Sequence, residues 1–168
     1  MPQVRRTIRP VSLPRDVEAI MNVFAAAKAI MRSAGNPSQW ADDYPTLEVV
    51  RADARREGAF VIEDDEKIVA YFALLSSPEP TYAHIEGGAW ADDKRPYHVL
   101  HRIASTPESS GIFCSIVSFA FSQTDNLRID THQDNRIMQH LLRKHGFRYC
   151  GIIFLASGDE RLAYQKLL

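Results

Sequence analysis

The amino-acid sequence predicts a single α/β domain, in which one mixed central β-sheet is flanked by helices on both faces. Two early apolar runs are separated by a short acidic turn, which favours an antiparallel hairpin. In residues 99–154 strands alternate with helices, which favours parallel pairing through right-handed crossovers. A mixed sheet satisfies both patterns. The chain of 168 residues is long enough for one domain with its own core, so we expect residues 1–168 to form one unit.

Composition narrows the class of protein. The net charge of −1 gives no electrostatic reason to expect a nucleic-acid or membrane partner. No apolar run approaches the roughly 20 residues that span a bilayer, and we expect no secretory signal. Cys114 and Cys150 match neither a metal-binding nor a redox spacing, and each lies among apolar residues. We therefore expect two buried free thiols, no metal, and a cytoplasmic location.

The first half of the chain begins with a short strand over residues 4–10. A helix is predicted over residues 15–33, because apolar side chains recur there at helical spacing, and Gly35-Asn36-Pro37 ends it. Thr46 is positioned to cap a second helix over residues 47–57. Strands 60–62 and 68–75 then form the hairpin.

Residues 76–96 form the longest region without a clear period, broken only by a short extended piece at 83–86. A loop of this length in a compact domain is usually functional. The remaining elements alternate and close with a strand. They are a strand at 99–105, a turn at 106–111, a helix at 112–123, a strand at 127–131, a helix at 137–145, and strands at 149–154 and 161–167.

The turn at 106–111 has the local features of a phosphate-binding site. It joins a strand to the start of a helix, where backbone N–H groups lack partners and the helix dipole favours negative charge. Such a place is suited to phosphate groups. This turn and helix start therefore predict a phosphate-bearing cofactor, on backbone grounds alone and without reference to any reactive side chain.

Two motifs within residues 99–154 resemble those of a known family. They are the turn Glu108-Ser109-Ser110-Gly111-Ile112-Phe113 and the helix Asn135-x-x-Met138-x-x-Leu141-Leu142-x-Lys144-x-Gly146-Phe147. With the order of elements over nearly the whole chain, they resemble the GNAT superfamily of acyl-CoA-dependent N-acyltransferases. Further segments around Gln39-Trp40, residues 85–90, residues 101–105 and residues 130–135 resemble a subgroup of that family without a defined substrate.

The resemblance implies acetyl-CoA as cofactor. It implies that the turn wraps the pyrophosphate, that the backbone of residues 103–105 faces the pantetheine arm and polarises the thioester, and that the second helix flanks the cofactor. The residues expected to bind it are Ile103, Ala104, Ser105, Ser109, Ser110, Gly111, Ile112, Phe113, Asn135 and Met138.

Three positions depart from the family pattern. Glu108 stands where a neutral or basic residue is usual, and Phe113 replaces a small residue at the turn. An acidic group is repelled by a pyrophosphate, and a large ring could crowd it. Leu142 stands where many members carry the tyrosine that protonates the departing thiolate.

A base must take a proton from the attacking amine. Glu86, in the long loop, is the first candidate, and His101 and His132 are its rivals. Large aromatic side chains in the irregular segments are expected to wall an acceptor pocket, since such side chains often do so. They are Trp40, Tyr44, Tyr82 and Trp90.

These observations predict an N-acetyltransferase that moves an acetyl group from acetyl-CoA to a primary amine, on a small molecule or an amino-acid-like acceptor. Attack would be direct, within a ternary complex. Two alternatives stay open: an enzyme acting on protein or peptide amines, and a non-catalytic acyl-CoA-binding module. A homodimer is also left open.

Overall fold

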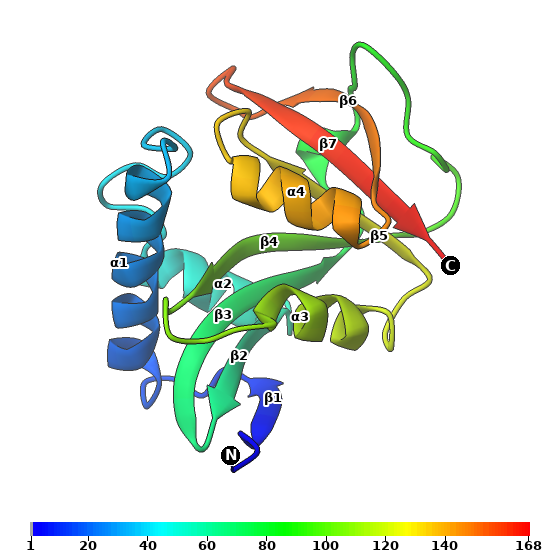
Figure 1. Ribbon diagram of the computed structural model, residues 1–168. Helices are drawn as coiled ribbons and strands as arrows, with labels where there is room; N and C mark the ends of the chain where they lie inside the picture. The colour runs from blue at the N-terminus through cyan, green and yellow to red at the C-terminus, as the bar shows by residue number, and fades with distance from the viewer. Residues whose placement is uncertain (1) are drawn as a thin grey trace.

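The computed structural model describes residues 2–168 and contains one mixed sheet of seven strands in the order β1-β2-β3-β4-β5-β7-β6 (Figure 1). The pairing of β4 with β5 is parallel, and the other neighbours are antiparallel. The predicted α/β class and mixed sheet are confirmed. The strands are β1 Arg6–Pro10, β2 Ala59–Asp64, β3 Lys67–Ser76, β4 His98–Ser105, β5 Asn126–Thr131, β6 Arg148–Phe154 and β7 Glu160–Leu167.

Helices cover both faces of the sheet, as the sequence predicts (Figure 1). Helices α1 (Val17–Ser33) and α2 (Leu47–Arg55) pack on one face, where the apolar stripe of α1 is buried against β3 and β4. Helices α3 (Ile112–Ala120) and α4 (Arg136–Lys144) pack on the other face. Burial of these apolar faces is the main term that holds the layers together, at about 25 cal/mol per Å² of apolar surface.

Side-chain caps begin two of these helices. The Thr46 hydroxyl accepts a hydrogen bond from the Val49 N–H at 3.2 Å, which confirms the predicted cap of α2. At α4, the Asn135 carboxamide oxygen accepts from the Met138 N–H at 3.0 Å. Each cap satisfies one backbone donor that the helix itself leaves free.

The long loop between β3 and β4 is packed against the sheet. It contains one short 3-10 turn, η1 (Pro80–Tyr82), and the expected extended piece is reduced to an isolated bridge between Glu86 and Ile152. The Arg128 guanidinium lies between the rings of Trp90 and Tyr97, at 4.0 and 3.8 Å from their centroids. These contacts bind the loop to β5 and to a buried cluster that includes Tyr82, Val99 and Ile153.

The two cysteines differ in exposure. Cys150 is a buried free thiol, as expected, and burial raises its pKa. Cys114 is exposed, so the expectation of a buried thiol is wrong there. It occupies the first turn of α3, on the side of the helix turned away from the buried stripe.

The sheet opens between β4 and β5. Their pairing covers only residues 98–100 with residues 127–129, although β4 runs on to Ser105 and β5 to Thr131. The register of β4 against β3 shifts by one extra residue around Arg102, whose φ is 54°. This β-bulge bends the strand and increases its twist. None of the helices in residues 2–168 combines the length and apolar character needed to cross a bilayer.

Candidate functional site

Two cavities meet where β4 and β5 separate. One has a volume of about 440 Å³ and the other about 520 Å³. We call the first the acceptor cavity and the second the cofactor cavity. The residues common to both are Met31, Ile103, Asn135 and Met138. The two cavities therefore adjoin at β4.

The cofactor cavity is formed by the far end of β4, the following turn, and the first turns of α3 and α4, with α1 opposite. All ten residues predicted to bind the cofactor line it. They come together because the chain turns directly from β4 into α3, and because Asn135 begins α4 next to the same strand end. Cofactor binding by these residues stays a prediction.

The start of α3 has the features of an anion site. Gly111 precedes the helix with φ at 67°, in the left-handed region, and the N–H groups of the first turn have no acceptor within the helix. Lys144 and Arg136 line the same cavity from α4. Backbone donors, the helix dipole and two cationic side chains therefore surround a space where phosphates are favoured.

The two departures in the turn do not obstruct this cavity. The Phe113 ring lies in the core, 6.2 Å from the Phe147 ring and 5.1 Å from the His145 ring between centroids, so its backbone stays accessible. Glu108 is exposed and lies outside the lining of the cavity. Leu142 is fully buried on the core-facing side of α4, and its aliphatic side chain has no proton to donate.

A chain of amides links α4 to the segment that follows α1. The Asn135 amide donates to the Gln39 side-chain oxygen at 2.9 Å, and the Asn36 amide donates to the same oxygen at 2.9 Å. Asn135 therefore positions α4 and Gln39 at once, at the boundary of the two cavities.

A cluster of titratable side chains lines the acceptor cavity around His101. The imidazole Nε2 lies 3.4 Å from a Glu79 carboxylate oxygen, and Nδ1 lies 4.0 Å from an Asp130 oxygen. The hydrogen bond with His101 lowers the pKa of Glu79 to about 2. The Tyr82 hydroxyl donates to Asp130 at 2.6 Å, and burial keeps the pKa of Tyr82 well above its usual value.

An ion pair forms another wall of the acceptor cavity. Arg102 donates from Nε to Asp53 at 2.9 Å and from a second nitrogen to the other carboxylate oxygen. Tyr71 donates to Asp53 at 2.7 Å, and Arg102 donates to the Tyr44 hydroxyl at 3.2 Å. The network connects α2, the β4 bulge and the loop after α1.

The structure separates the other predicted site residues. Trp40 and Tyr44 line the acceptor cavity. Tyr82 and Trp90 belong to the long loop itself, and their side chains are buried in a core cluster against the sheet. Tyr82 reaches the site only through its bond to Asp130.

Among the three predicted bases, His101 lines the acceptor cavity. Glu86 is exposed, contacts His84 at 3.0 Å, and lies outside the lining of both cavities. The ring of His132 accepts from the Asp134 N–H at 3.0 Å, and burial lowers its pKa. It too lies outside both linings.

Sequence reasoning missed several side chains of the acceptor cavity: Gln39, Asp53, Glu79, Arg102, Asp130 and Arg161. The only available signal was that Gln39, Arg102 and Asp130 fall in segments that resemble the family subgroup. Nothing local distinguishes Asp53 or Arg161 from an ordinary surface charge.

Comparisons with known proteins identify the family of this chain. No protein-family model and no curated protein matches it. A GNAT-family acetyltransferase from Streptococcus agalactiae 2603 has a similar solved structure, with 30% sequence identity and a TM-score of 0.86, covering 97% of this chain and 95% of that one. A putative acetyltransferase from Staphylococcus aureus Mu50 matches at 22% identity with a TM-score of 0.69, covering 96% and 98%. A GNAT-family acetyltransferase from Listeria monocytogenes 4b F2365 matches at 17% identity with a TM-score of 0.71, covering 97% and 95%. At this identity and coverage, the first comparison shows that the chain belongs to the GNAT family of acetyltransferases.

Proposed function

We propose that the protein is an N-acetyltransferase that moves an acetyl group from acetyl-CoA to a primary amine of a small molecule, by direct attack in a ternary complex. One observation carries the proposal: the cofactor cavity and the acceptor cavity share a wall at Ile103, Asn135, Met138 and Met31. An acyl donor in one and an amine in the other would meet there without a covalent enzyme intermediate.

The residues present fit acetyl-CoA, which supplies an activated acetyl thioester when bound. The first turn of α3, with Gly111, Lys144 and Arg136, would hold the pyrophosphate. The edge of β4 that turns away from β5 would hold the pantetheine amides through backbone groups. A backbone N–H near Ile103 would donate to the thioester carbonyl oxygen, and one such donor is commonly worth about 3 kcal/mol in the transition state.

His101 is the base in this proposal. It lies in the acceptor cavity, whereas Glu86 and His132 do not. Glu79 and Asp130 flank its two ring nitrogens and would stabilise the imidazolium that forms when it takes the amine proton. Because Leu142 is apolar and buried, we assign protonation of the departing thiol to water.

Calorimetric titration with acetyl-CoA tests the first half of the proposal. The informative variant is Gly111→Asp, because Asp tolerates the left-handed backbone and adds a negative charge at the helix start that would hold the phosphates. The added Cβ would lie 3.8 Å from an Arg6 nitrogen, an ordinary contact distance. Gly111→Asn is the matched neutral control. We expect Gly111→Asp to weaken binding about tenfold more than Gly111→Asn. Equal affinities, or no binding to the wild type at millimolar ligand, would reject the assigned cofactor site.

A thiol-release assay over a panel of amines tests the second half. Turnover with small amines supports the proposal. Turnover with peptides alone would favour a protein N-acetyltransferase. Acetyl-CoA binding with no release on any amine would favour a non-catalytic acyl-CoA-binding module.

A further inference from the structure

The acceptor cavity contains a buried arginine without a carboxylate partner. Arg161, at the start of β7, is 5% exposed and lines this cavity. Its guanidinium donates to two backbone carbonyl oxygens, those of Glu160 at 2.8 Å and Gln39 at 3.3 Å. Within residues 2–168 no carboxylate oxygen lies within 4.0 Å of it.

The other arginines that are shielded from solvent are all paired. Arg6 binds Asp64, Arg9 binds Asp16 and Glu63, Arg102 binds Asp53, and Arg128 reaches Asp93. A guanidinium stays charged in proteins, and burying a charge without a partner is costly. The exception at Arg161 therefore indicates that its partner is supplied from outside the chain, in the cavity that it lines.

An unsatisfied hydroxyl also borders this cavity. The Thr131 hydroxyl is fully buried, lines the same cavity, and has no hydrogen-bond partner among the described residues. Thr131 is paired across β5 and β7 with Leu162, the residue next to Arg161. Successive side chains of a strand point to opposite faces, so Thr131 and Arg161 lie at the same end of the sheet but on opposite faces of it. The planar donor fork of Arg161 by itself matches the two oxygens of a carboxylate.

The same cavity has acidic groups at His101. Glu79 and Asp130 line it together with the imidazole, and they attract a cationic amine. The acceptor cavity thus offers a cationic group for an anion and an acidic cluster for an amine. An uncharged or purely cationic acceptor would leave the Arg161 guanidinium without a counter-charge.

We propose that the acceptor is an amine that also carries a carboxylate, such as an amino acid, and that Arg161 binds this carboxylate. The inference rests on the proposed function and gives it a substrate class. Binding there would also orient the amine, because the carboxylate is held by one end of the cavity while the nitrogen faces His101.

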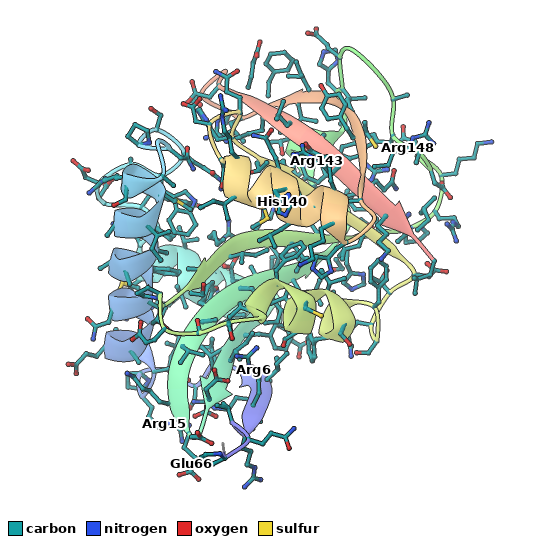
Figure 2. All side chains as sticks on the ribbon, in the orientation of Figure 1. Arg6, Arg15, Glu66, His140, Arg143 and Arg148 are labelled. Carbon is teal, nitrogen blue, oxygen red and sulfur yellow. The ribbon has the colours of Figure 1, made fainter. Side chains whose placement is uncertain are left out.

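The test compares amino acids with their carboxamides in the thiol-release assay. We expect kcat/KM to be at least about a hundredfold higher for the carboxylate, because the amide leaves buried polar groups badly paired. Arg161→Gln should reduce this preference to about one, chiefly by raising KM for the amino acid, and Arg161→Lys should restore part of it. Arg148→Gln, on an exposed arginine of β6, makes the same chemical change elsewhere and should keep the preference (Figure 2).

Two readouts separate the possible failures. Retained acetyl-CoA affinity in Arg161→Gln shows that the variant is folded, since Arg161 does not line the cofactor cavity. Equal turnover of amino acids and amides by the wild type would overturn the inference and leave the acetyltransferase intact. If no amine is acetylated, the proposed function fails, and calorimetry with amino acids and their amides still decides the carboxylate site: equal affinity, or no binding of either, overturns it.

Discussion

The ion pair between Asp53 and Arg102 allows a sharp test of how the acceptor cavity is held. Asp53→Asn keeps the shape of the side chain and removes its charge. The two side chains are 4% and 15% exposed, so the guanidinium would be left in a largely buried place with only the Tyr44 hydroxyl as a further partner. We expect the free energy of unfolding to fall by about 3–5 kcal/mol, the usual cost of removing one member of a buried pair.

Urea unfolding followed by tryptophan fluorescence measures this loss, because Trp40 lies in the same core cluster as Tyr71, the other donor to Asp53. Asp42→Asn is the matched control. Asp42 pairs with Arg32, but their side chains are 97% and 48% exposed, so the cost should stay below about 1 kcal/mol.

A double variant strengthens the test. Asp53→Asn combined with Arg102→Gln should cost less than the sum of the single changes, because the second change removes the uncompensated charge. A loss in Asp53→Asn no larger than in Asp42→Asn, or full additivity in the double variant, would refute the reasoning that Arg102 depends on Asp53.

Two further predictions concern the cluster around His101. His101→Ala should lower kcat/KM a hundredfold to ten-thousandfold and remove the acidic limb of the pH profile of kcat/KM. Glu86→Ala should leave kcat/KM and its pH profile close to wild type. The reverse pattern in steady-state kinetics would return the base role to Glu86. Glu79, whose pKa is lowered to about 2, contributes stability that is fully present above its ordinary value near 4.5 and is lost as the pH falls from there toward 2. Urea titrations between pH 6 and pH 3 should therefore show the stability difference between wild type and Glu79→Gln shrinking below about pH 4.5, and a difference that grows as the pH falls would contradict the assignment.

Much of the fold was predictable because its signals are local. The apolar spacing of α1, the Thr46 cap and the acidic turn of the hairpin each act within a few residues. Several observed ends coincide with the predicted ones, and the others differ by at most three residues, as at α3, which ends at Ala120 before a turn. The cofactor cavity was predictable for the same reason: its turn lies between β4 and α3, which adjoin in sequence.

The acceptor cavity was less predictable, because its side chains come from segments far apart in the chain. Glu86 occupies the right loop, but its backbone bridge to β6 leaves the side chain in solvent, whereas Glu79 in the same loop reaches His101. The ring of Phe113 shows the same limit, since only packing against Phe147 decides that it leaves the turn free.

The sequence by itself determined the order of elements, the helix start that suits phosphates and the likeness to the GNAT family. Tertiary structure alone decided the chemistry of the acceptor cavity. The insertion of β7 between β5 and β6 brings Arg161 into the cavity that His101 also lines, and the packing of α2 puts Asp53 against Arg102. The physical reason is the distance along the chain over which each interaction acts. Caps and periodicity depend on neighbouring residues, whereas the pairing of buried charges depends on which strands the whole sheet brings together.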